Sequence, residues 1–324
     1  MAERQLDKKV LDFVYKLQDK YESVGEDLAD HLEGILYSDY TNYWDYVGID
    51  ALLNLQKPKT KYPDEMIFII YHQITELYFK IIIHELELIG FNKNLTKDFF
   101  IKKMNRINKY FGHLSDSFHI LVSGMETDQF LKFRTALTPS SGFQSIQYRL
   151  IELWSTEFNN LVTREKRGDF DANSSIKEMY EHLHWKEGAT ERETGKKTLT
   201  LTQFEEKYEK LILRKGEEFR TTNMWSRYMS LPLIDRKDEI LIAALKQFDV
   251  HANINWRLAH YRYAAKYLKR ESHVARSTGG TNWQEYLPPQ FQKQIFYPGL
   301  WTVDELENWG KSWVENVFLS KSVE

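Results

Sequence analysis

His72 lies midway along the most apolar stretch of the chain, residues 66–83, where an imidazole without a polar partner is costly to bury. In a helix, Phe68, Thr75 and Phe79 would share its face, since Phe68, His72, Thr75 and Phe79 follow one another at steps of four, three and four. Two aromatic rings, an imidazole and a hydroxyl could line a ligand pocket. A core histidine bonded to a backbone carbonyl would produce the same pattern, so both interpretations remain open here.

His260 follows Trp256 by one helical turn, which places both rings on one side of a helix. The chain has no cysteine, so a redox or metal site would have to use histidine, carboxylate or tyrosine. A neutral imidazole from a long helix is the usual proximal ligand of haem iron. The alternative is a packed or surface histidine. Because His72 and His260 come from distant segments, one could face each side of a haem.

Arg134 and Phe130 are also one helical turn apart. A guanidinium beside an aromatic ring suits a ligand that carries both a carboxylate and a ring, because arginine binds carboxylate through two parallel hydrogen bonds. An interhelical salt bridge would explain Arg134 equally well. Further along, Thr278 and Gly279 open a Thr-Gly-Gly-Thr loop whose glycines permit close backbone approach to a ligand, although a plain helix stop explains them too.

A non-haem metal centre is the weaker interpretation. Glu181 and His184 form one Glu-x-x-His motif, whereas a di-iron bundle needs two such motifs and two more carboxylates. We therefore expect the remaining histidines to have packing or surface roles.

The elements that must position these residues are predicted to be helices. Only 15 glycines and 7 prolines interrupt the 324 residues, and apolar residues recur every three or four positions. One such seam comprises Phe100, Met104, Ile107, Phe111, Leu114, Phe118 and Leu121. We expect helices at about 6–17, 64–91, 100–121, 128–137, 142–161, 202–229, 235–269 and 303–318. Residues 64–91 should form a central, buried helix.

The predicted fold class is all-α, with one large helical domain over residues 1–324. The only strand candidate is Thr198–Thr202. Residues 165–200 are polar and rich in charge, so we expect an exposed excursion there.

Charge and composition limit the partners. Lysine and arginine number 44 and aspartate and glutamate 47, interleaved to a net charge of −3, which argues against nucleic-acid binding. The polar residues within 66–83 argue against a membrane span. The absence of cysteine and of a secretory signal pattern fits a cytoplasmic protein.

Six blocks, in order, resemble the tryptophan 2,3-dioxygenase family. They cover most of the chain from about residue 43 to 301 and read YWDYVGID at 43–50, PDEMIFIIYHQ at 63–73 running into ELYFK at 76–80, FR at 133–134, SGFQS at 141–145 with QYR at 147–149, Trp256-Arg257 with His260, and TGG at 278–280. The resemblance implies a helical domain built around a haem pocket, with one haem b per subunit.

By position, the resemblance makes His260 the proximal haem ligand and His72 the residue that hydrogen-bonds the indole N–H of L-tryptophan. Arg134 would bind the substrate carboxylate, and Thr278 its ammonium and carboxylate end. Phe68 and Phe130 would form the walls of the pocket; Phe130 lacks the hydroxyl that a tyrosine gives some family members here.

The remaining positions concern the cofactor and the neighbouring subunit. Trp256 would pack near the proximal histidine, and Gly279 would contact the cofactor. Tyr43, Tyr46 and Val47 match positions that reach a neighbouring subunit's active site in this family. The resemblance thus implies a homotetramer, a dimer of dimers, in which residues 1–60 pack on a neighbour.

The implied reaction inserts both atoms of O2 into the indole C2=C3 bond of L-tryptophan and gives N-formyl-L-kynurenine, the first step of tryptophan catabolism by the kynurenine pathway. Two alternatives remain: a haem-dependent aromatic hydroxylase that inserts one oxygen atom, and a haem-binding sensor without turnover.

Overall fold

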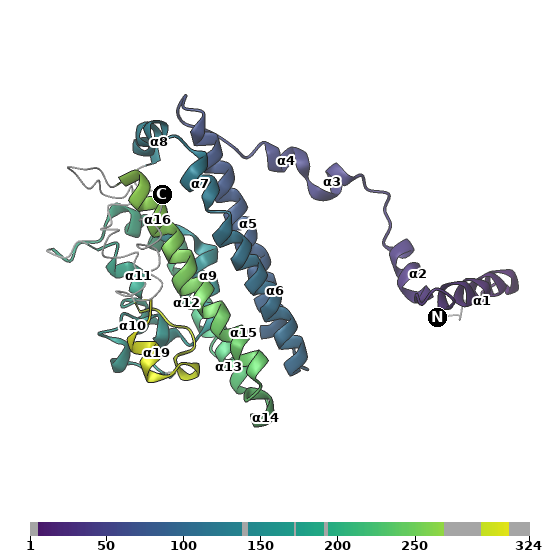
Figure 1. Ribbon diagram of the computed structural model, residues 1–324. Coiled ribbons are helices and arrows are strands. Elements are labelled where there is room, and N and C mark those ends of the chain that lie inside the picture. The colour runs from purple at the N-terminus through teal and green to yellow at the C-terminus, as the bar shows by residue number, and fades with distance from the viewer. Residues whose placement is uncertain (1–5, 138–141, 172, 191–193, 269–292, 311–324) are drawn as a thin grey trace, which may run out of the picture. The chain divides into compact units, whose positions relative to one another are not determined.

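Helices build the fold of this computed structural model, which describes residues 6–137, 142–171, 173–190, 194–268 and 293–310 (Figure 1). Within those ranges there is no strand, only two isolated β-bridges, Val162 with Leu183 and Thr190 with Lys197. The predicted all-α class is therefore confirmed. The chain divides into two compact units, Met1–Lys57 and Pro58–Glu324.

The N-terminal unit contains the helices α1 (Lys8–Glu22), α2 (Leu28–Leu36), α3 (Tyr43–Val47) and α4 (Ile49–Leu53). Helix α1 packs against α2, where the rings of Tyr21 and His31 stack at 4.0 Å. Leu28 is the one buried apolar residue in the described part of this unit. The unit therefore has almost no hydrophobic core of its own, and its apolar side chains face solvent.

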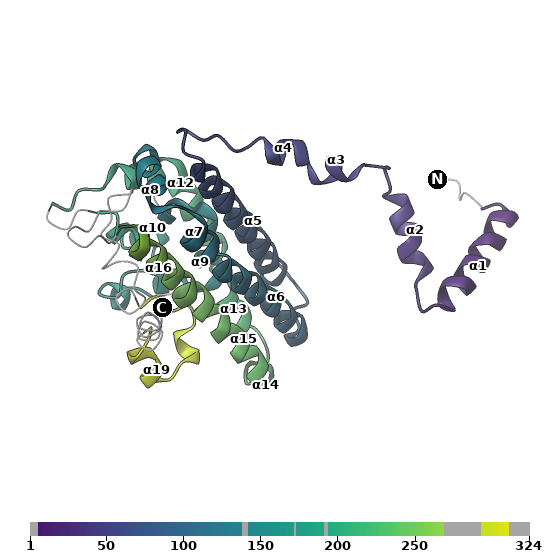
Figure 2. The ribbon, with the colours of Figure 1, turned by 45° about the horizontal axis from the view of Figure 1, so that its top comes forward.

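The second unit is organised around α5 (Asp64–Gly90), which packs against both α6 (Lys97–Asp116) and α9 (Ile146–Ser155). Helix α6 in turn packs against α15 (Glu239–Val250), and Figure 2 shows these long helices running side by side. The seam predicted between Phe100 and Leu121 is buried at every position. At the end of α5, a Cβ on Gly90 would overlap the ring of Trp154, so only glycine allows this close approach.

Helix α5 is not buried on every side, and that prediction is wrong. One face exposes six apolar residues that recur at steps of three, four or seven: Met66, Ile70, Ile74, Leu77, Ile81 and Leu88. We call these six residues the α5 stripe. The helix also has the length and apolar composition of a membrane span, with a mean hydropathy of 1.4, as core helices of soluble proteins can have. Next to the α5 stripe, buried Glu85 pairs with Lys103 and Arg106 of α6.

The remaining helices and turns follow α6 along the chain. They are α7 (His119–Gly124), α8 (Thr127–Phe133), the 3-10 turns Arg134–Leu137, Gly142–Gln144, Phe158–Leu161, Arg167–Asp169 and Pro298–Leu300, α10 (Ile176–Tyr180), α11 (His184–Glu187), α12 (Leu199–Glu218), α13 (Met224–Met229), α14 (Leu233–Arg236), α16 (Trp256–Leu268) and α19 (Val303–Glu307).

Several predicted elements differ from the structure. The helix expected over 100–121 is α6 and α7, and the one expected over 142–161 is α9 between two 3-10 turns. The helix expected over 202–229 is two helices, α12 and α13, and the one expected over 235–269 contains a π-helical turn at His251–Asn255. The strand expected at Thr198–Thr202 is wrong, because the Thr198 side chain accepts a hydrogen bond from the amide of Leu201 and caps α12.

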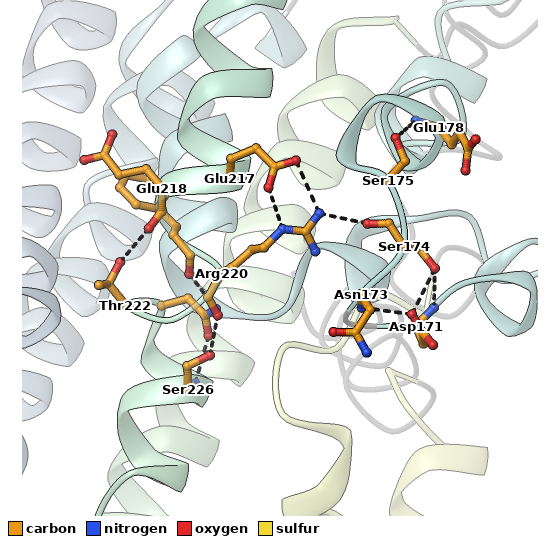
Figure 3. A network of polar contacts seen from close by, with 12 residues as sticks. Asp171, Asn173, Ser174, Ser175, Glu178, Glu217, Glu218, Arg220, Thr222 and Ser226 are labelled. Atoms are coloured by element: carbon orange, nitrogen blue, oxygen red, sulfur yellow. Dashed lines mark hydrogen bonds and ion pairs between the residues drawn. The ribbon is translucent and has the colours of Figure 1, made fainter.

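The expected exposed excursion over 165–200 is also wrong for its middle part. The Lys186 side chain is buried between Glu181 and Glu205, at 3.0 and 2.7 Å. Nearby, Arg220 pairs with Glu217 and donates to the carbonyl of Ser174, which ties the turn before α10 to the end of α12 (Figure 3). The charge of Lys186 is therefore neutralised inside the protein, so a polar sequence is not always a solvated one.

Candidate functional site

His72 projects from α5 with a defined tautomer. Its Nδ1 lies 2.7 Å from the carbonyl oxygen of Phe68, one turn earlier. Because a carbonyl can only accept, Nδ1 carries the proton and the neutral ring keeps a lone pair on Nε2. His72 is exposed to solvent, yet desolvation by the surrounding protein lowers its pKa, so the ring is neutral at physiological pH. His72 can therefore accept a hydrogen bond at Nε2.

His260 has the same arrangement on α16. Its Nδ1 lies 2.9 Å from the carbonyl oxygen of Trp256, which leaves the Nε2 lone pair available to a metal. Burial lowers the pKa of His260 to about 4. The nearby positions of His72 and Arg257 lower this pKa further, so the two histidines from distant segments lie within electrostatic range of each other.

Aromatic rings connect the two histidines. The ring of Phe118, between α6 and α7, lies 4.7 Å from His260 and 5.2 Å from Trp256. It also contacts Tyr71 at 5.6 Å, next to His72 on α5. The structure thus brings together α5, α7 and α16 around the predicted ligand and substrate histidines. Sequence reasoning assigned Phe118 only to the core seam, because its helical spacing carries no sign of a functional contact.

Phe68 and Phe130 form a wall next to His72. The Phe68 ring centroid lies 4.1 Å from that of His72 and 6.3 Å from that of Phe130. The Phe130 ring in turn contacts Tyr263 of α16, with 5.5 Å between the ring centroids. Arg134 begins the 3-10 turn after α8 and is half-buried, and burial lowers its pKa without removing its charge.

Arg134 interacts electrostatically with Tyr263, whose hydroxyl is buried and has no hydrogen-bond partner among the described residues. The Arg134 guanidinium and the Tyr263 hydroxyl could both donate hydrogen bonds to the carboxylate of a ligand. Tyr263 was missed from sequence, since a tyrosine three residues after His260 has no spacing signal of its own.

The other predicted residues belong to the N-terminal unit or lie outside the described ranges. Tyr43, Tyr46 and Val47 lie on α3 of the N-terminal unit and are exposed by 70%, 84% and 44%. Thr278 and Gly279 lie outside the described residues.

The donor set fits a haem. Haem iron takes axial imidazole nitrogen, and His260 has its Nε2 lone pair available with Nδ1 already committed to a carbonyl. The surrounding aromatic residues Trp256, Phe118 and Phe68 suit an apolar macrocycle. Among the described residues, no group of three or more His, Asp or Glu side chains could hold a metal ion instead.

The Glu181–His184 motif has a structural role. His184 is buried, and its Nε2 lies 3.0 Å from Glu152, which also pairs with Arg149 at 3.2 Å. A separate cavity of about 30 Å³ lies between the end of α9 and the end of α12. It has room for water but not for an amino acid, and none of the predicted site residues lines it.

Comparison with known proteins identifies the family. A family model described as tryptophan 2,3-dioxygenase matches residues 33–277, about three quarters of the chain. The chain belongs to the tryptophan 2,3-dioxygenase family. A tryptophan 2,3-dioxygenase from Ruegeria sp. (strain TM1040) is 30% identical over 82% of this chain and 93% of its own length. The corresponding protein of Bradyrhizobium diazoefficiens is 27% identical over the same shares. That of Alteromonas mediterranea is 33% identical over 61% of this chain and 53% of its own.

Proposed function

We propose that this member of the family is a haem-dependent dioxygenase that converts L-tryptophan and O2 to N-formyl-L-kynurenine. The observation that carries the proposal is the meeting of His72 and His260. Each donates Nδ1–H to a carbonyl of its own helix and each keeps Nε2 available, within electrostatic range of the other. One imidazole can then bind a metal while the other accepts a hydrogen bond from a substrate.

In this proposal His260 holds haem b as its proximal ligand, with Trp256 packed beside it at 4.5 Å. When bound, ferrous haem supplies the centre at which O2 is activated. The chain's own residues bind and orient the amino acid. Gly279 and Thr278 would complete the cofactor and substrate contacts by family resemblance.

The substrate would be held at its two ends. Arg134 binds the carboxylate, with the Tyr263 hydroxyl near it. His72 accepts the indole N–H at Nε2, and Phe68 and Phe130 pack on the ring. An indole N–H is a very weak acid, and His72 with its lowered pKa is a weak base, so the role of His72 is to orient the ring. Holding both ends positions the C2=C3 bond and excludes water.

The test uses the full chain loaded with haem, reduced without oxygen, mixed with L-tryptophan and then exposed to ¹⁸O2. We expect a product that carries both labelled atoms. A haem-dependent hydroxylase would give a product with one labelled atom, and a haem sensor would give no product. Either of those results would overturn the proposal.

We further propose that the chain assembles as a homotetramer in the cytoplasm. The N-terminal unit buries one apolar residue in its described part, and the α5 stripe is open to solvent; a second copy of the chain is the occupant that would cover such surfaces. Tyr43, Tyr46 and Val47 would then reach the active site of a neighbour, as residues 1–60 pack on it.

A further inference from the structure

We propose that the Tyr148 hydroxyl is a positioning group that holds the π turn before α16 and thereby sets the direction of His260. This inference rests on the proposed role of His260 as the haem ligand. It adds a residue of α9 that would act through the backbone of the π turn.

The π turn interrupts an otherwise continuous helical run from α15 into α16. At His251–Asn255 the backbone is π-helical, and the amide of Trp256 donates to the carbonyl of His251, five residues earlier. In an α-helix the same amide would donate to the carbonyl of Ala252. The π turn therefore deprives the Ala252 carbonyl of its α-helical donor.

Tyr148 replaces that donor. Its hydroxyl donates to the Ala252 carbonyl at 2.9 Å, and both residues are buried. A buried carbonyl without a donor is unfavourable, so the hydroxyl stabilises the π form of this turn. An α-helical turn would need no such contact, because Trp256 would already occupy the carbonyl.

Other contacts hold the same turn in place. The side chain of Asn253 donates to Asp249 at 2.8 Å, and Asp249 also accepts from the amides of Phe296 and Tyr297. The Tyr148 ring packs on Phe79 at 5.3 Å, and Phe79 packs on Trp256 at 5.7 Å. Tyr148 is thus fixed by the same α5 helix that carries His72.

The π turn matters because of helical phase. One residue corresponds to about 100° of rotation, so a turn that holds one extra residue rotates everything after it by about that angle. His260 is five residues beyond the turn and contacts Phe118 in this phase. If the turn were α-helical, the imidazole of His260 would point away from Phe118 and from the side of α16 that faces His72.

Tyr148→Phe removes only the hydroxyl. Tyr228→Phe is the matched control, because Tyr228 is equally buried and its hydroxyl also donates to a backbone carbonyl, that of Arg236 at 2.7 Å. Both variants are loaded with haem and compared with the parent by the iron–histidine stretching frequency of the ferrous form and by the rate of haem transfer to a scavenging protein.

We expect Tyr148→Phe to shift the stretching frequency and to release haem about tenfold faster, the factor that one lost hydrogen bond gives. Tyr228→Phe should match the parent in both. Equal behaviour of the two variants would overturn the inference. So would loss of helical circular dichroism in haem-free Tyr148→Phe alone, because the hydroxyl would then serve folding instead of positioning.

His260→Ala separates this inference from the proposed function. If His260→Ala retains the parental stretching frequency, the proposed ligand is wrong and the inference falls with it. If His260→Ala loses that signal while Tyr148→Phe behaves like Tyr228→Phe, only the positioning role is overturned.

Discussion

At the scale of single residues, local geometry prepares both histidines before any ligand is bound. His72 and His260 each bond a carbonyl four residues earlier, an interaction available inside any helix. It fixes the tautomer and gives the same lone pair on Nε2 in both rings. What differs is the use that the surroundings allow: metal binding for the half-buried ring of His260 and hydrogen bonding for the exposed ring of His72.

Arg134→Gln is the sharpest residue-scale prediction. Loss of a charge-assisted contact to the substrate carboxylate costs about 1.5–3 kcal/mol, so KM for L-tryptophan should rise about 10- to 100-fold while kcat changes less. Steady-state kinetics of the haem-loaded variant measure both. Lys132→Gln, which removes an exposed cation two residues earlier, is the control and should leave KM unchanged. A larger fall in kcat than rise in KM would contradict a role in binding.

At the scale of elements, buried polar contacts join segments that look independent in the sequence. Glu152 on α9 lies 3.0 Å from His184 of α11, and Lys186 of the same short helix pairs with Glu205 of α12. Burial lowers the pKa of His184 to about 4 despite the nearby carboxylate, so this histidine is neutral in the folded protein near pH 7. The segment expected to be exposed is held in the core by these contacts.

This pair predicts how stability depends on pH. His184 binds a proton near pH 6.5 when unfolded and only near pH 4 when folded, so the unfolded chain takes up the proton first. The free energy of unfolding should fall as pH decreases from about 6.5 towards 4, with His184 accounting for about 2 kcal/mol between pH 7 and 5. Urea unfolding of the haem-free protein at both pH values measures this.

His184→Gln should make that pH dependence shallower by the same amount. His113→Gln, an exposed histidine on α6, should leave it unchanged. A parental pH dependence in His184→Gln would show that His184 is not neutral in the folded state.

At the scale of the whole molecule, one copy of the chain leaves apolar surface uncovered. The α5 stripe runs along a helix whose other side carries the site, and α1 exposes Val10, Phe13 and Leu17 at helical spacing. Monomeric proteins rarely expose contiguous apolar surface of this extent without a binding role. Assembly of copies would account for it.

Ile70→Glu combined with Leu77→Glu tests this assembly. Two carboxylates on the α5 stripe should be too costly to bury against a second copy, so the variant should sediment as smaller species than a tetrameric parent. Ile240→Glu, a single exposed position on α15, is the control and should keep the parental mass. A monomeric parent in analytical ultracentrifugation would contradict the proposed tetramer.

Periodicity was sufficient for the helical class, the buried seam from Phe100 to Leu121 and the shared face of His72 and Phe68, but not for the breaks within the helices. The first three depend on neighbours one turn apart. The blocks of family residues named the histidines and Arg134 in advance. Only the tertiary structure showed four further features. They are the contact of α5 and α16 with Phe118, the position of Tyr263 beside Arg134, the exposed side of α5 and the π turn. These features depend on contacts between residues far apart along the chain, such as the 104 residues that separate Tyr148 from Ala252, and local spacing carries no record of them.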